Sequence, residues 1–308
     1  NYILSFADNK IILKGQIVPA TADIRFYSDK EHKNLISIRH EVTYDSEKHP
    51  VEAMVRGVLL TDGTYEKVTH TLVYICDAIH YNSTEAPSLA ETYQVQLTVT
   101  DTNYVSSQKS VELIIHKAEV DIVFGGDIVQ VYGAVDGGLT AKAMKDFKNS
   151  RFSSDLTVNY YDGDGNYVSD IRVADAGEYT AVAEFGGNAN FDAKRGETAF
   201  TIKRRETRAT FNMHSGYPYT GKEVSVDVYF DYNGKIYRPD LIFDYVDADG
   251  TSHAYNYGEE RLSDKYPVNV GRYLVSINNG MKNFDIVDDY KVTFEITKVT
   301  VTVKIKDY

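Results

Sequence analysis

The chain has 308 residues, of which 43% are hydrophobic and 25% charged, a composition typical of a folded, soluble protein. Its net charge of −12 argues against nucleic acid and anionic lipid as main partners, because both bind basic surfaces. A single cysteine, Cys76, excludes an internal disulfide, and no apolar run reaches the roughly 18 residues of a membrane helix. Because the sequence begins with Asn1 rather than Met, we expect a fragment or a mature product.

Short stretches that alternate apolar and polar residues run along the chain, and such alternation predicts strands with one buried face. The clearest are 93–99, 224–230 and 299–305. One segment, 139–147, has apolar residues at helical spacing and is predicted to be a single short helix in an otherwise all-β chain.

Three landmarks recur in each third of the chain: a tyrosine within a strand, an asparagine followed by an aromatic residue, and a strand that ends in lysine. The tyrosine-to-lysine separations are 24, 24 and 25, and the tyrosine-to-asparagine separations are 10, 11 and 10. In chain order the residues are Tyr93, Asn103 and Lys117; Tyr179, Asn190 and Lys203; and Tyr273, Asn283 and Lys298. Spacings kept this closely three times predict internal repeats.

Each copy also has a matching start, at Tyr44-Asp45-Ser46, Tyr132-Gly133-Ala134 and Tyr219-Thr220-Gly221, which we call the opening tyrosines. These landmarks predict domains at 35–117, 118–204 and 205–298. Residues 1–34 are then a partial preceding repeat or an N-terminal extension, and 299–308 are the first strand of a following repeat. The short linkers at 117–120 and 203–208 predict a semi-rigid, monomeric rod.

Repeats of roughly 80–95 residues with about seven short strands have the size of an immunoglobulin-like β-sandwich. The predicted fold class is therefore all-β, with tandem immunoglobulin-like β-sandwich domains in an extended array. Residues 175–181 support it, because they resemble the Asp-x-Gly-x-Tyr-x-Cys pattern of the tyrosine corner, with Ala181 in place of cysteine. The predicted structural corner tyrosines are Tyr93, Tyr179 and Tyr273.

The Tyr-Gly-x opening at Tyr132, the Gly-x-Tyr corners and the asparagine-aromatic and Ile-x-Lys endings resemble the bacterial MBG-type immunoglobulin-like repeats. The resemblance covers most of 35–298 and is best in the second repeat, whereas the opening at Tyr44 lacks glycine. Such repeats occur in tandem in large secreted and cell-wall-attached proteins, often adhesins. The resemblance therefore implies an extracellular location, either secreted or at the cell surface. It brings no catalytic residues, because these repeats share none.

A calcium loop and a hairpin turn are both compatible with the acidic segment after residue 161. Asp162, Asp164, Asn166 and Asp170 space their oxygens like the start of a calcium loop, but the glutamate that would end such a loop is missing. The Asp-Gly and Gly-Asn pairs equally suit a tight β-hairpin turn. Calcium is the only cofactor that the sequence suggests.

The third repeat is longer than the others through an aromatic insertion at 251–266. Loops at the ends of sandwiches often bind partners, and exposed tyrosines stack on sugars, so Tyr255, Tyr257 and Tyr266 are candidate binding residues for a glycan or protein. The alternative is a long hairpin whose tyrosines pack on their own strands.

The enzyme-like motifs are incomplete. Gly216 to Lys222 fits the start of a phosphate-binding loop, but Glu223 replaces the serine or threonine that would hold Mg²⁺. Cys76 lies in an apolar strand and is predicted to be a buried hydrophobic residue. The recurring lysines and asparagines permit lysine–asparagine isopeptide bonds, although the asparagines also suit a turn. An intact-mass measurement would decide this, because each bond releases ammonia.

These observations predict a non-catalytic segment of a bacterial surface protein that acts as a stalk or adhesin region. A glycan- or protein-binding module, with a host or cell-surface partner, is the first alternative. Accessory modules of a secreted glycan-degrading enzyme are the second.

Overall fold

The computed structural model of the chain describes residues 2–7, 10–15, 17–254, 266–278, 280–287, 291–304 and 306. Within these ranges the chain consists of strands, with no α-helix and two short 3-10 turns, η1 (Asp77–Ile79) and η2 (Ile171–Val173). It divides into two compact units. The first unit holds 1–124, 141–157 and 183–196, and the second unit holds 125–140, 158–182 and 197–308. The fold class is all-β with tandem β-sandwiches, as predicted.

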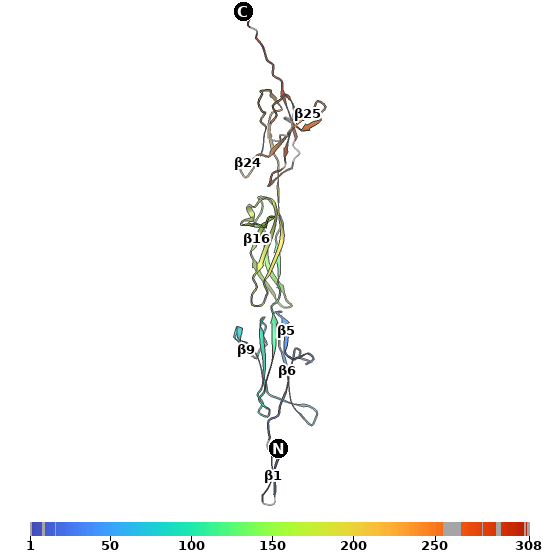
Figure 1. The fold of residues 1–308 in the computed structure, drawn as a ribbon, viewed down its shortest axis with the longest axis vertical. Coiled ribbons are helices and arrows are strands. Elements are labelled where there is room, and N and C mark those ends of the chain that lie inside the picture. Colours follow the sequence, from blue (N-terminus) through green and yellow to red (C-terminus); the bar gives the residue numbers. More distant parts are fainter. Residues whose placement is uncertain are drawn as a thin grey trace. The chain divides into compact units, whose positions relative to one another are not determined.

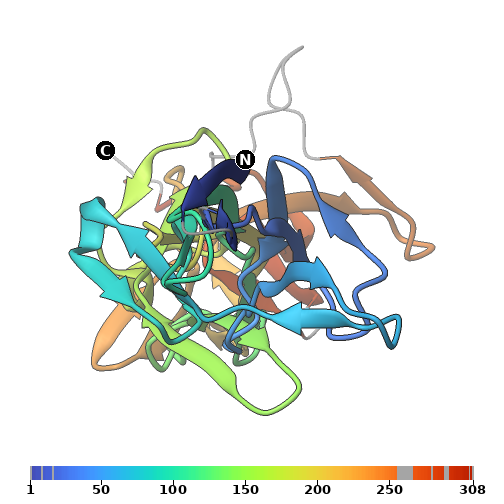
Figure 2. The same ribbon diagram turned by 90° about the horizontal axis from the view of Figure 1, so that it is seen from below.

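The first repeat is drawn from blue to green in Figure 1 and is seen from below in Figure 2. Its strands are β3 (Asp23–Tyr27), β4 (Leu35–Ile36), β5 (Arg39–Thr43), β6 (Glu52–Leu59), β7 (Tyr65–Lys67), β8 (His70–Cys76), β9 (Tyr81–Ser83), β10 (Thr92–Val99) and β11 (Gln108–His116). They form a five-stranded sheet in the order β5-β11-β10-β8-β9 and a four-stranded sheet in the order β4-β3-β6-β7. The first strand of the larger sheet, β5, runs parallel to the last, β11.

Alternation of apolar and polar residues builds the core of this repeat. In β10 the side chains of Tyr93, Val95, Leu97 and Val99 are at most 1% exposed. Phe26 of β3, in the other sheet, belongs to the same apolar cluster, so the two sheets pack face to face. The strand predicted over 93–99 is confirmed as part of β10.

Residues upstream of 35, the predicted start of the first repeat, also take part in its sheets. β3 pairs antiparallel with β6, and Ala20 forms a bridge with Tyr104. These pairings join 20–34 to the first repeat. Further upstream, β1 (Tyr2–Ala7) and β2 (Lys10–Gly15) form a separate antiparallel hairpin.

The second repeat forms two sheets in the orders β12-β14-β15 and β13-β19-β18-β16-β17. Its strands are β12 (Asp121–Gly125), β13 (Val129–Val131), β14 (Thr140–Asp146), β15 (Arg151–Leu156), β16 (Val158–Asp162), β17 (Tyr167–Val168), β18 (Gly177–Phe185) and β19 (Lys194–Lys203). The larger sheet repeats the strand order of the first repeat, with β13 parallel to β19.

The helix predicted over 139–147 is wrong, because this segment forms β14, which pairs antiparallel with β15. Ala141 and Ala143 are 3% and 0% exposed, so the apolar residues follow a period of two with Leu139 at its start. A few apolar residues fit both periods, and the tertiary pairing decides between them.

The third repeat forms sheets in the orders β20-β28, β21-β23-β24 and β22-β29-β27-β25-β26. Its strands are β20 (Arg205–Thr207), β21 (Thr210–Asn212), β22 (Gly216–Pro218), β23 (Asp227–Tyr232), β24 (Lys235–Tyr237), β25 (Asp240–Val246), β26 (Ser252–Ala254), β27 (Gly271–Asn278), β28 (Phe284–Ile286) and β29 (Lys291–Thr297). Its five-stranded sheet has the same order once more, with β22 parallel to β29.

Two predicted strands of this region differ from the structure. Of 224–230, only residues from Asp227 onward lie in β23, although Val224 and Val226 before it are buried. The described residues 299–304 belong to no strand. Their valines are exposed.

Candidate functional site: the repeat junction

The predicted corner tyrosines share one hydrogen bond. Each hydroxyl donates to the carbonyl four residues upstream, and this is the bond that defines a tyrosine corner. The pairs are Tyr93 to Leu89 at 3.1 Å, Tyr179 to Asp175 at 2.6 Å and Tyr273 to Asn269 at 2.8 Å. Burial raises the pKa of Tyr93 to about 12. The bond fixes the loop before the tyrosine, including the backbone N–H of the residue three positions upstream.

The opening tyrosines are held at the same end of each repeat. Each follows the strand that runs parallel to the last strand, and its backbone N–H donates to a carbonyl at the end of that last strand. The pairs are Tyr44 to His116 at 2.8 Å, Tyr132 to Lys203 at 2.9 Å and Tyr219 to Thr297 at 2.9 Å. The opening tyrosine therefore lies where the chain leaves its repeat.

The asparagine-aromatic pair lies where the chain enters a repeat. The backbone carbonyl of each asparagine accepts a hydrogen bond from the backbone N–H of the residue with which the chain enters the repeat. The pairs are Ala20 to Asn103 at 3.0 Å, Ala118 to Asn190 at 3.0 Å and Arg205 to Asn283 at 2.9 Å. The aromatic residues that follow, Tyr104, Phe191 and Phe284, are 2–4% exposed.

The first junction, which lies within the first unit, joins these two elements from successive repeats. The side-chain carbonyl of Asn190 accepts a hydrogen bond from the N–H of Ala90, three residues before the corner Tyr93, at 3.1 Å. The ring of Tyr44 meets Phe191 edge-on with 5.3 Å between centroids, and Phe147 at 5.6 Å. Tyr44 thus packs against the core of the second repeat.

The second junction, which lies within the second unit, has the same arrangement. The side-chain carbonyl of Asn283 accepts from the N–H of Ala176, three residues before Tyr179, at 2.8 Å. The ring of Tyr132 meets Phe284 edge-on at 5.4 Å. Tyr132 packs against the core of the third repeat.

Charged groups reinforce this second junction. The Asn283 side-chain NH₂ group donates to Asp175 at 2.7 Å, and the Lys282 ammonium lies 2.5 Å from the other oxygen of Asp175. The bonds from Lys282 and Asn283 hold the pKa of Asp175 below its ordinary value. Arg205 donates to the Tyr132 carbonyl at 2.9 Å.

Glycine suits the second opening, because Gly133 has a φ of +70°, a conformation in which other residues are strained. A Cβ added there would also overlap the Tyr232 hydroxyl, which would have to shift. The guanidinium of Arg205 also lies 5.2 Å from the Tyr232 ring centroid. The glycine of the Tyr-Gly-x motif therefore lets the next repeat approach closely.

The junction role of the asparagines could not be predicted, because Asn190 and Asn283 bond to residues 100 and 107 positions earlier. Their recurrence at constant spacing was the signal, but it named no partner. The structure gives these carboxamides non-covalent partners in the preceding repeat. The isopeptide hypothesis for Lys117, Lys203 and Lys298 stays a prediction that an intact-mass measurement would test.

Of the predicted calcium residues, Asp162, Asp164 and Asn166 lie at the turn of the β16–β17 hairpin, and Asp170 lies between β17 and η2. One oxygen of Asp162 accepts from the N–H groups of Asp164 and Asn166, at 3.0 and 2.8 Å. Asp170 accepts from Arg172, which lowers the pKa of Asp170 to about 2. These carboxylates already have internal partners. In the described part of the chain, no three His, Cys, Asp or Glu side chains form a group that could hold a metal ion.

Of the three predicted binding tyrosines of the insertion, the structure describes one. Tyr255 and Tyr257 lie outside the described residues. Tyr266 is half-buried, with its ring 5.3 Å from that of Phe243, and packs on the core of the third repeat. Its placement is that of a packing residue.

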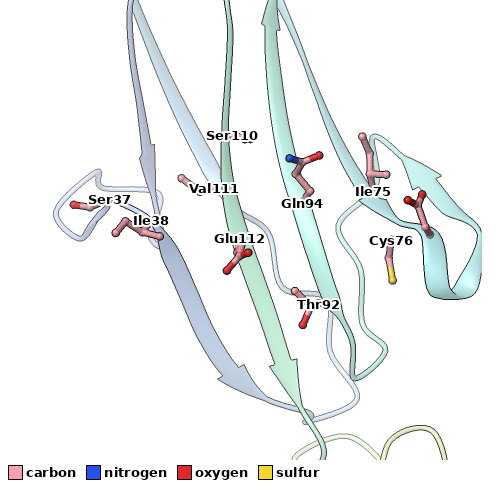
Figure 3. A pocket seen from close by; sticks show the side chains of 10 residues that line it. Ser37, Ile38, Ile75, Cys76, Thr92, Gln94, Ser110, Val111 and Glu112 are labelled. Atoms are coloured by element: carbon pink, nitrogen blue, oxygen red, sulfur yellow. The ribbon is translucent and has the colours of Figure 1, made fainter.

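A hollow of about 520 Å³ lies on the five-stranded sheet of the first repeat (Figure 3). Gln94 and Glu112 are paired across β10 and β11 along it. Its lining has Asp77 and Glu112 as carboxylates and the Cys76 thiol, but no histidine, lysine or arginine. The 5% exposed Cys76 is a buried residue, as predicted.

Among the described residues, no helix is long and apolar enough to cross a membrane. No protein-family model matches the chain, and neither does any curated protein.

The chain is similar to several solved structures, and the three described next have low sequence identity to it. A fragment of a 1.5-MDa bacterial ice-binding adhesin is 10% identical with a TM-score of 0.29, covering 93% of this chain and 100% of that one. Human cadherin-23 repeats 21–23 are 12% identical with a TM-score of 0.26, covering 84% and 98%. The Bacteroides ovatus protein SGBP-B, solved with a mixed-linkage heptasaccharide, is 12% identical with a TM-score of 0.18, covering 90% and 71%.

Proposed function

We propose that this chain is a non-catalytic stalk or adhesin segment of a bacterial surface protein, in which each junction couples one sandwich to the next. One observation carries the proposal: the contact of opening tyrosine, asparagine and aromatic residue occurs at both junctions, with the same partners by position. The proposed repeats are 118–204 and 205–298, with a first repeat that starts near Ala20 and ends at Lys117.

The energy of such a contact is sufficient for mechanical coupling. An edge-to-face aromatic pair contributes about 0.5–1.5 kcal/mol beyond its buried area. A neutral hydrogen bond contributes about 0.5–1.5 kcal/mol more. Together they amount to several times the thermal energy of about 0.6 kcal/mol, so each junction resists bending and twisting of its linker.

An extracellular stalk also accounts for other features of the chain. The one cysteine is buried, and the acidic net charge opposes self-association. Stability in such arrays comes from each repeat and its neighbours, without a catalytic centre.

Small-angle X-ray scattering of the chain tests the proposal. A compact particle of 308 residues has a radius of gyration of about 19 Å. The stalk predicts a clearly larger value that is independent of salt, and a value near 19 Å would contradict it. The double variant Tyr44→Ala/Tyr132→Ala should broaden the distance distribution, whereas Tyr219→Ala is the matched control that leaves it unchanged.

A further inference from the structure

We propose that the exit end of the third repeat is half of a third junction, which receives a further sandwich joined directly after Lys298. This sandwich would carry an asparagine-aromatic pair. The inference deepens the stalk proposal by naming the partner of this surface, and three separate observations lead to it.

The first observation is the opening tyrosine of the third repeat. Tyr219 is held by the same backbone hydrogen bond as Tyr44 and Tyr132. Those two rings are covered by aromatic residues of the next repeat, whereas Tyr219 is 38% exposed. Exposure of one ring is ordinary by itself, but Tyr219 has the same position in its repeat as the two tyrosines that contact the next sandwich.

The second observation is the corner loop. Val270 stands three residues before Tyr273, as Ala90 and Ala176 stand before their corner tyrosines. Ala90 is 6% exposed, but Val270 is 41% exposed. The hydrogen bond from Tyr273 to Asn269 fixes this loop as the matching bonds fix the other two corner loops. The N–H of Val270 therefore has the position from which Ala90 and Ala176 donate to an asparagine side chain.

The third observation is the segment after Lys298. The backbone N–H of Tyr219 donates to Thr297, the residue just before Lys298. In the same way, the N–H of Tyr44 donates to His116, the residue just before Lys117, so the chain leaves both repeats in the same register. In this register Val299, Val301 and Val303 correspond, in that order, to Ala118, Val120 and Ile122 of the second repeat. Ala118 and Val120 are buried there, and Ile122 is partly buried. Ala118 and Val120 are 2% and 1% exposed, whereas Val301 and Val303 are 78% and 76% exposed. The valines have the pattern of a first strand whose core is supplied by the next sandwich.

The entry end of the first repeat has an asparagine and a hairpin at the positions that the second and third repeats use at their junctions, but here both are exposed. They indicate the chemistry that the partner sandwich should have. Asn103 is exposed, whereas Asn190 and Asn283 are half-buried. Beside it, the β6–β7 hairpin exposes Val58, Leu59 and Leu60, where the matching hairpins of the other repeats carry Phe147 and Tyr232. The partner surface is therefore an asparagine flanked by a buried aromatic residue and an apolar hairpin. The valines after Lys298 require that it follow in the same chain.

The test extends the full chain by replacing 299–308 with a second copy of 118–204. Residue-resolved amide hydrogen exchange is then measured by NMR in the original and extended chains. We expect the Val270 amide to exchange at least about tenfold more slowly in the extended chain, since a hydrogen bond of about 1.4 kcal/mol corresponds to that factor. Tyr219→Ala should remove this protection in the extended chain and have no effect on Ala176 in either.

Unchanged exchange at Val270 would overturn the inference, provided that the added copy shows slow exchange in its own β18 strand and is therefore folded. Equal protection in the Tyr219→Ala variant would also overturn it, because the docking would then not use this surface. Neither result depends on the scattering test of the stalk, which concerns the two junctions already formed.

Discussion

The two junctions use the same positions but different chemistry. In the first, the residue that accepts the corner hydrogen bond is Leu89, whereas in the second it is Asp175. The residue before the junction asparagine is Ala189 in one and Lys282 in the other. The corner loop and asparagine of the first junction therefore carry no charged pair, although Glu47 nearby accepts a hydrogen bond from Asn149 at 2.8 Å. The second junction adds an ion pair and a second bond from Asn283.

This difference shows which contacts the two junctions share and which contacts vary between them. Both copies keep an aromatic ring on an aromatic ring and one asparagine bond to a backbone N–H, so these define the contact. The charges vary, because an exposed ion pair contributes little in water and is screened by salt. Two junctions of one chain, with and without an ion pair at the corner loop, can be compared under identical conditions.

The largest expected effect comes from the aromatic residues that both junctions share. Phe191→Ala and Phe284→Ala should each lower the stability of their repeat by about 3–5 kcal/mol, since both rings are nearly fully buried. Urea unfolding measures this loss. The comparison predicts similar values for the two variants, and a loss confined to one of them would show that the junctions differ in their apolar part.

A smaller effect is expected from the asparagines, and it should differ between the junctions. Asn190→Ala removes one hydrogen bond, which corresponds to about 1 kcal/mol. Asn283→Ala removes two and leaves Asp175 with one partner fewer, so about 1–3 kcal/mol is expected. Amide exchange at Ala90 and Ala176 gives both values. Asn103→Ala is the control, because its side chain is exposed, and equal losses at all three positions would refute the assignment.

Acid should weaken the Asp175 contacts of the second junction. The pKa of Asp175 is lowered in the folded chain, so the ionised carboxylate stabilises the junction. This stabilisation is complete above the ordinary pKa near 3.8 and is lost as the pH falls through the lower pKa of the folded chain. Protection at Ala176 should decline below about pH 3.8, measured relative to Ala90. Asp175→Leu, which restores the residue of the first junction, should abolish the decline. A parallel decline at Ala90 would mean that other carboxylates cause it.

Calcium should have the smallest effect, and none is the expected result. Asp162, Asp164, Asp170 and Asp175 line one hollow beside the second junction, but the carboxylates of Asp162, Asp170 and Asp175 already accept internal hydrogen bonds. Adding millimolar calcium should therefore leave the thermal midpoint and the Ala176 exchange unchanged. A calcium-dependent rise in the midpoint that Asp162→Asn removes would instead establish a calcium site in this hairpin.

The sequence determined the class of the fold and the recurring framework. Alternation in segments such as 93–99 specifies strands with one buried face, and the spacing of tyrosine, asparagine and lysine specifies repeats. The corner at Tyr179 was readable because its hydrogen bond spans only four residues. Such features depend on neighbours in the chain, and their physics is local.

Only the tertiary structure decided the rest. Residues 139–147 carry too few apolar positions to distinguish two periods, and pairing with β15 made them a strand. Residues 20–34 joined the first repeat through partners far along the chain. Asn190 and Asn283 became junction residues through bonds to backbone groups in another repeat, and a backbone N–H leaves no mark in a sequence because every residue except proline has one.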